Sequence, residues 1–189
     1  MKKDIILCGV GGQGILSIAT IIGEAATKAG LHLKQAEVHG MSQRGGDVQS
    51  HLRLSSAPIY SDLVALGCVD LIISMEPMEC LRYLPYLAET GKIVTGNKPF
   101  INIPNYPEQA ALDAELAALP AVDLLDIEAV AKDAGNARGA NMVLLGMAAR
   151  HLEILSPEQL CDAIRTIFAR KGEAVVEANI KAFQAGYSN

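Results

Sequence analysis

The sequence predicts an α/β domain with three layers (α/β/α), a mostly parallel sheet and a helical C-terminal part. An apolar segment at residues 4–8 leads directly into a cluster of glycines and then into a helical pattern, which is how a strand-turn-helix unit begins. Short apolar runs then alternate with helical patterns as far as residue 125, as in a doubly wound fold. Half of the residues are hydrophobic, so the chain can form one core of ordinary size.

The expected strands are short apolar runs bounded by glycine, proline or polar residues. The first run is continuously apolar, as in a parallel strand that is buried on both faces. The third run alternates apolar and polar residues, which also favours a strand. We expect the strands at residues 4–8, 33–38, 48–54, 71–75, 92–95 and 122–125.

Capping residues and glycines delimit the expected helices. Pro77 suits the first turn of a helix, Ser156 suits an N-cap, and Gly30 and Gly186 suit the positions just after a helix ends. The segment 97–107 holds three prolines and is expected to be a loop. We expect helices at residues 14–29, 77–87, 108–119, 127–133, 140–152, 157–170 and 173–185.

Two of these helices are apolar nearly all the way round, at residues 15–22 and 142–147. Such a helix must be covered on every side. Burial by the chain's own sheet is the simpler explanation, and a large obligate partner is the alternative. We expect one domain over residues 1–189, with an α/β core at 1–126 and a helical part at 127–189.

Charge and cysteine spacing exclude several classes of protein. The formal net charge is -5 and the sequence has no long basic run, so nucleic-acid binding is not expected. The uncharged stretch 5–23 is interrupted by glycines, which favours a strand, a turn and a helix over a membrane helix or a signal peptide. We therefore expect a cytoplasmic protein. The four cysteines contain no Cys-x-x-Cys pair, so no zinc or iron-sulfur site is expected in this chain.

The glycine turn, residues 9–14, fits the G-x-G-x-x-G pattern between a strand and a helix, which makes the fold Rossmann-like. Glycines let the backbone approach a phosphate closely, and the N–H groups at a helix start attract anions. Glu37 ends the expected second strand, where a nicotinamide enzyme places its ribose-binding acid. A tight turn that serves only backbone packing is the alternative. The candidate binding residues are Gly9, Gly11, Gly12, Gln13 and Gly14.

The arginine loop, residues 39–46, is a second candidate anion site. Arg44 can form two parallel hydrogen bonds to a phosphate or carboxylate, and the glycines beside it can turn N–H groups toward the same ligand. A solvated turn that the arginine ties down is the alternative. The candidate residues are His39, Ser42, Gln43, Arg44, Gly45 and Gly46.

No catalytic residues are expected in this chain. The sequence lacks a Gly-x-Ser-x-Gly elbow, a His-Glu-x-x-His pair and a Walker lysine. His39 and His51 are expected to be structural, because no carboxylate-rich metal spacing accompanies them. Cys8 lies in the first strand and is expected to be a buried small hydrophobe.

These segments resemble the gamma-type subunits of 2-oxoacid:ferredoxin oxidoreductases and, within that family, more closely the beta subunit of indolepyruvate ferredoxin oxidoreductase. The resemblance covers essentially the whole chain, and the block at residues 37–46 is its most specific part. It also rests on the glycine turn with Ile15 and on Glu76-Pro77, Leu81-Arg82-Tyr83-Leu84, Gly139-Ala140-Asn141-Met142 and Asn179-Ile180-Lys181-Ala182-Phe183.

The resemblance implies a small subunit of an enzyme that converts a 2-oxoacid, such as indolepyruvate or another aryl pyruvate, and coenzyme A into acyl-CoA and carbon dioxide. Ferredoxin would accept the electrons. Thiamine diphosphate, Mg²⁺ and [4Fe-4S] clusters would lie on a large partner subunit, and the isolated chain would be inactive. The glycine turn and the arginine loop would line the active-site entrance and hold the phosphates of coenzyme A, while Glu37 would orient the loop.

Two other functions are compatible with the residues alone. One is a free-standing NAD(P)-binding oxidoreductase that uses Gly9, Gly11, Gly14 and Glu37. The other is a non-catalytic assembly subunit, in which changes to the arginine loop would leave activity normal.

Overall fold

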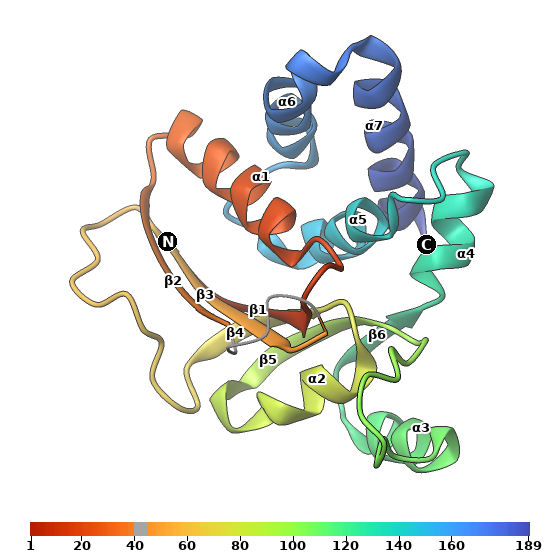
Figure 1. Ribbon diagram of the computed structural model, residues 1–189. Helices are drawn as coiled ribbons and strands as arrows, with labels where there is room; N and C mark the ends of the chain where they lie inside the picture. The colour runs from red at the N-terminus through yellow and green to blue at the C-terminus, as the bar shows by residue number, and fades with distance from the viewer. Residues whose placement is uncertain (40–44) are drawn as a thin grey trace.

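The computed structural model describes residues 1–39 and 45–189, and within them six strands form one central sheet (Figure 1). The strand order is β2-β3-β1-β4-β5-β6. Strand β3 runs antiparallel to both of its neighbours, and the other five strands share one direction. The predicted α/β class with a mostly parallel sheet is therefore confirmed. The strands are β1 (Lys2–Val10), β2 (His32–His39), β3 (Asp47–Ser55), β4 (Val69–Ser74), β5 (Leu87–Gly96) and β6 (Val122–Leu125).

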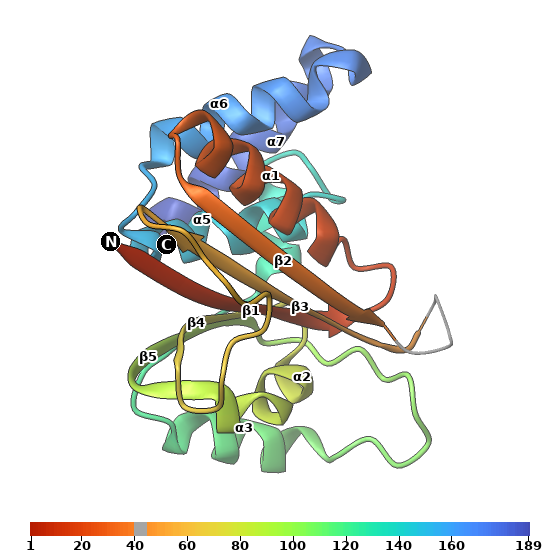
Figure 2. The same cartoon turned by 90° about the vertical axis from the view of Figure 1, so that its left-hand side faces the viewer.

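Helices cover both faces of the sheet, as Figures 1 and 2 show. One face carries α1 (Ile15–Lys28), α4 (Ile127–Asp133) and α5 (Ala140–Leu152), with α6 (Pro157–Phe168) and α7 (Glu173–Ser188) packed outside α1 and α5. The other face carries α2 (Pro77–Arg82) and α3 (Gln109–Ala118). No helix in the described part of the chain is long and apolar enough to cross a membrane.

Two hydrophobic cores form on the two faces because successive strand residues point to opposite sides. In β1, Ile5 and Leu7 pack in the core beneath α1 and α5, whereas Ile6 and Cys8 pack in the core beneath α2. All four side chains are fully buried. This double burial explains why the first strand is apolar at successive positions.

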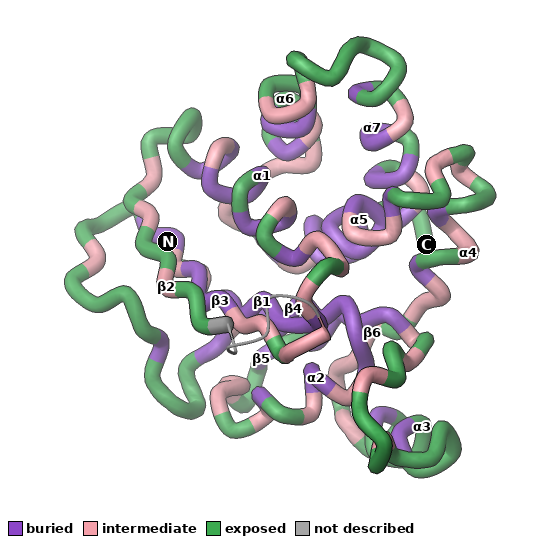
Figure 3. Tube along the Cα trace, viewed as in Figure 1, coloured by how far each residue is buried: buried purple, intermediate pink, exposed green. Residues whose placement is uncertain are grey.

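The two all-apolar helices are covered from within the chain, as the simpler explanation predicts. Helix α5 lies at the centre of the helical side, in contact with β4, β5 and the other helices (Figure 3). Its residues from Met142 to Ala149 are all buried. Helix α1 is buried against the sheet and α6, although Leu16 near its start remains 42% exposed.

The boundaries of three elements differ by more than two residues from the prediction. Helix α2 ends at Arg82 and a short 3-10 turn at Leu84–Tyr86 follows, because Pro85 interrupts an α-helix. Strand β5 then begins at Leu87 rather than at residue 92. Helix α7 continues through Gly186 to Ser188, so the prediction that Gly186 ends the helix was wrong.

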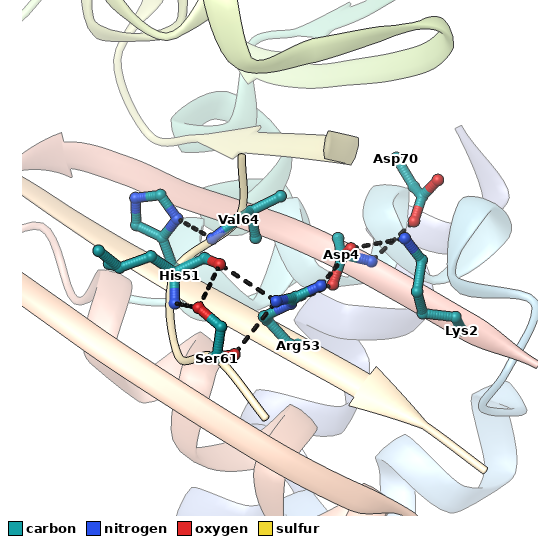
Figure 4. A network of polar contacts seen from close by, with 8 residues as sticks. Lys2, Asp4, His51, Arg53, Ser61, Val64 and Asp70 are labelled. Atoms are coloured by element: carbon teal, nitrogen blue, oxygen red, sulfur yellow. Dashed lines mark hydrogen bonds and ion pairs between the residues drawn. The ribbon is translucent and has the colours of Figure 1, made fainter. Parts of the chain in front are cut away.

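A buried ion pair fixes the long connection between β3 and β4 to the sheet (Figure 4). Asp4 is fully buried and accepts hydrogen bonds from Arg53 Nε at 2.7 Å and Nη2 at 3.1 Å. Arg53 Nη1 also donates to the backbone carbonyls of Ser61 and Leu63. Burial alone would raise the pKa of Asp4, but the hydrogen bonds from Arg53 and Lys2 lower it.

Candidate functional site

The glycine turn joins the end of β1 to the start of α1, as the sequence predicts. Gly12 and Gly14 have φ angles of 106° and 87°, a region that glycine adopts without strain. The turn is held from inside, because Gln13 Oε1 accepts a hydrogen bond from the Val10 N–H at 2.7 Å. Asn141 at the start of α5 donates from Nδ2 to the Gly14 carbonyl at 3.2 Å.

The end of the arginine loop lies against the glycine turn. The Gly11 N–H donates to the Gly46 carbonyl at 2.8 Å, and the Gly45 N–H donates to the Gly11 carbonyl at 3.3 Å. Such close contact between two backbones requires residues with little or no side chain. The structure thus brings the described ends of the two predicted anion-binding segments to one place.

A cavity of about 410 Å³ opens beside the glycine turn. Its walls are mainly apolar and come from β1, α1 and β3, with Val10, Ile15, Leu16 and Val48 among them. Within the described residues, the Gly12 and Gly14 N–H groups have no hydrogen-bond acceptor. The first N–H groups of any α-helix are also free of internal partners. The cavity therefore combines apolar walls with nearby N–H groups that have no acceptor within the described residues.

The glycine turn lies at the topological switch point of the sheet. From β1 the chain crosses toward β2 on one side, whereas β4, β5 and β6 follow in order on the other side. In open α/β sheets, ligands bind at the carboxyl ends of the strands at this point. The loop that follows β4 meets the glycine turn there, where a Cβ on Gly9 would lie 3.1 Å from Met75 Cβ.

The position of Glu37 does not fit a dinucleotide site. Strand β3 lies between β1 and β2, so Glu37 pairs with Ser50 and not with a residue of β1. Two strand spacings correspond to about 9–10 Å. Glu37 is exposed, and its carboxylate accepts a hydrogen bond from Gln35 Nε2 at 2.6 Å.

The other residues that the sequence analysis singled out are two histidines, one cysteine and the centre of the arginine loop. His51 is buried, and its Nδ1 accepts a hydrogen bond from the Val64 N–H at 3.1 Å, a contact expected of a structural histidine (Figure 4). Burial, with a smaller contribution from Arg53, lowers the pKa of His51. Cys8 is fully buried, and this burial raises the pKa of its thiol. His39 ends β2, whereas Ser42, Gln43 and Arg44 lie outside the described residues.

The donor atoms of the described residues do not fit a metal ion or cluster. No group of three or more His, Cys, Asp or Glu side chains there is arranged to hold a metal. A [4Fe-4S] cluster needs four cysteine thiolates. Cys8 and Cys80 are buried, while Cys68 is exposed.

The sequence analysis did not identify two polar side chains, Glu76 and Asn102, that form hydrogen bonds near the glycine turn. Glu76, at the start of α2, is fully buried with its carboxylate directed to the 97–107 loop. Asn102 in that loop donates to the Gly45 carbonyl. No local pattern signals these contacts, because they join segments 24 and 57 residues apart.

Comparison with known proteins shows to which class of protein this chain belongs. The profile of the pyruvate ferredoxin/flavodoxin oxidoreductase family matches residues 4–189. The chain is 37% identical over 203 residues to the indolepyruvate oxidoreductase subunit IorB of Pyrococcus horikoshii, covering 98% of this chain and 95% of that protein.

Two solved structures have the same fold. The gamma subunit of a keto/oxoacid ferredoxin oxidoreductase from Geobacter sulfurreducens is 28% identical, with a TM-score of 0.69 over 98% of this chain and 96% of that one. A 2-oxoglutarate:ferredoxin oxidoreductase from Magnetococcus marinus, with 2-oxoglutarate, coenzyme A and succinyl-CoA bound, is 22% identical, with a TM-score of 0.76 over 99% of this chain and 30% of that one.

The chain therefore belongs to the pyruvate ferredoxin/flavodoxin oxidoreductase family. It is the small subunit of a 2-oxoacid:ferredoxin oxidoreductase, and it works within a multi-subunit complex that includes a larger catalytic partner.

Proposed function

We propose that this subunit serves an indolepyruvate ferredoxin oxidoreductase of the cytoplasm, which converts an aryl 2-oxoacid and coenzyme A into acyl-CoA and carbon dioxide and passes the electrons to ferredoxin. The 37% identity to the subunit from Pyrococcus horikoshii supports this substrate class. In this proposal thiamine diphosphate, Mg²⁺ and the [4Fe-4S] clusters belong to the large subunit and supply the carbanion and electron-transfer chemistry.

The glycine turn and the arginine loop line the entrance to the active site and hold the phosphates of coenzyme A. The observation that carries this proposal is the pair of hydrogen bonds between Gly11 and the Gly45-Gly46 backbone. These hydrogen bonds bring the N–H groups at the start of α1 close to Gly45, the residue that follows Arg44 in the sequence. Charge-assisted hydrogen bonds from Arg44 would contribute about 1.5–3 kcal/mol each, more than the helix dipole at about 0.3–1 kcal/mol.

The same end of the molecule has exposed apolar side chains that suit a partner subunit. Leu16 of α1 is 42% exposed beside the glycine turn, and Ile101 of the 97–107 loop is 72% exposed. Figure 2 shows that this loop and the start of α1 lie at the same end of the sheet. Docking of the large subunit here would cover these side chains and enclose the glycine turn.

The substrate and the partners are tested by purifying the tagged subunit from its own cells under strict anaerobiosis. We expect a brown complex with a large subunit that reduces ferredoxin when given indolepyruvate and coenzyme A. Turnover with indolepyruvate should exceed turnover with pyruvate and 2-oxoglutarate. A colourless chain that is purified alone and binds NAD(H) or NADP(H) would refute the proposal.

The role in coenzyme A binding is tested with Arg44→Ala in the assembled complex. The loss of one charge-assisted contact predicts a Michaelis constant for coenzyme A that is raised at least about tenfold. Arg170→Ala is the matched control, because Arg170 is exposed and lies in the turn before α7. If Arg44→Ala has normal activity and an unchanged Michaelis constant for coenzyme A, the arginine loop would instead serve assembly alone.

A further inference from the structure

The 97–107 loop connects β5 to α3 and is fixed by one buried carboxylate. Glu76 is fully buried, and its Oε1 accepts hydrogen bonds from the Phe100 N–H at 3.2 Å and from the Tyr106 hydroxyl. Its Oε2 accepts from the Glu79 N–H at 2.8 Å and so caps α2. The two contacts hold the loop on either side of residue 102, although the loop has no regular secondary structure of its own.

Asn102, between these two contacts, reaches the end of the arginine loop. Its Nδ2 donates to the Gly45 carbonyl at 2.7 Å. Gly45 and Gly46 are in turn hydrogen-bonded to Gly11. Hydrogen bonds at both ends and the backbone of the 97–107 loop between them therefore connect Glu76 to the glycine turn.

The hydrogen bond from Asn102 restrains the backbone of Gly45 and Gly46, which have no side chains of their own to do so. A glycine has no side chain with which to fix itself, and it loses more conformational freedom on ordering than any other residue. The contact with Gly11 involves backbone atoms only. Asn102 is the side chain that the described structure places on this pair of glycines.

We propose that Asn102 is a positioning residue for the coenzyme A site, and that Glu76 holds the loop that carries it. Asn102 keeps Gly45 and Gly46, the described end of the arginine loop, against Gly11. This inference rests on the proposed role of the glycine turn and Arg44 in holding coenzyme A. It assigns to the chain a residue that touches neither substrate nor cofactor but sets how tightly coenzyme A binds.

The test is Asn102→Leu in the assembled complex, because leucine has about the shape of the asparagine side chain, lacks the N–H donor and adds no charge beside the proposed phosphate site. We expect amide hydrogen exchange at Gly11 and Gly45 to become about fivefold faster, the effect of losing one neutral hydrogen bond. We also expect the Michaelis constant for coenzyme A to rise about fivefold while kcat changes less than about twofold. Asn105→Leu is the matched control, since Asn105 is exposed in the same loop.

A second variant, Tyr106→Phe, tests this connection without touching Asn102. It removes one of the donors to Glu76 and should produce smaller changes of the same kind. Unchanged amide exchange at Gly11 and Gly45 in Asn102→Leu would overturn the inference. An unchanged Michaelis constant for coenzyme A in Asn102→Leu would also overturn it if Arg44→Ala raises that constant, and the proposed function would then stand. If Arg44→Ala also has no effect, the proposed coenzyme A site fails together with the role inferred for Asn102.

Discussion

Two glycines allow α5 and α7 to cross in direct backbone contact, and replacing either one tests how this packing is achieved. A Cβ atom on Gly146 would lie 2.0 Å from the Phe183 carbonyl oxygen and 2.7 Å from the Tyr187 nitrogen. A Cβ atom on Gly186 would lie 1.9 Å from the Val143 carbonyl oxygen. Each helix therefore contributes one glycine at which the other helix passes.

The size of the effect follows from these distances. Ordinary van der Waals contact begins near 3.4 Å, so Gly146→Ala requires α7 to move away by more than about 1 Å. Overpacking a core costs about 1–3 kcal/mol and sometimes more, and a backbone cannot turn aside as a side chain can. Alanine regains up to about 1 kcal/mol of helix propensity. We expect Gly146→Ala to lower the free energy of unfolding by about 2 kcal/mol.

Gly23→Ala is the matched control within α1. A Cβ atom there would meet only Leu33 Cδ2, at 3.3 Å, and the end of a leucine side chain can move. The gain in helix propensity should then dominate, and stability should be unchanged or raised by up to about 1 kcal/mol. Urea unfolding followed by far-UV circular dichroism measures both variants. Equal shifts for Gly23→Ala and Gly146→Ala would refute the reasoning, because the helix crossing would then not be the cause.

Three further predictions concern the stability and reactivity of the chain. Asp4→Asn should lower the free energy of unfolding by about 3 kcal/mol, since Arg53 then lacks its buried counter-charge; a urea midpoint like that of the wild type would contradict this. Because the pKa of His51 is lowered in the folded state, the unfolded chain gains the proton first, and stability should fall as pH drops below about 6.5. His51→Gln should lack that part of the pH dependence in urea titrations. Iodoacetamide should label exposed Cys68 in the native chain and Cys8 only after unfolding, as mass spectrometry can show.

Local signals account for the parts of the fold that the sequence predicts well. Ser156 forms the expected N-cap of α6, with Gln159 completing a capping box. Helix α5 begins and ends where its apolar pattern does, at Ala140 and Leu152. These elements are specified by residues within a few positions of one another, so a single sequence is enough to locate them.

The errors occur where distant residues decide the structure. Gly186 has the sequence context of a helix end, yet it lies within α7. A glycine is needed at this position because the backbone of Val143 in α5 passes beside it. Similarly, Gly91 falls inside β5, where a Cβ atom would lie 2.6 Å from Leu87 Cδ1 and 2.8 Å from the Val69 carbonyl oxygen. In both cases a glycine provides close contact with another segment rather than a break in its own.

The glycine turn illustrates the same limit in the candidate site. Its spacing predicts the local shape correctly, a strand followed by a turn and a helix. A dinucleotide site also requires an acid on the neighbouring strand, but β3 occupies that place and Glu37 lies one strand further away. Moreover, the Gly11 N–H, which could face a phosphate in a dinucleotide site, is already bound to Gly46. The glycines here allow two backbones to meet, so the motif has to be interpreted together with the arginine loop and not as a dinucleotide fingerprint.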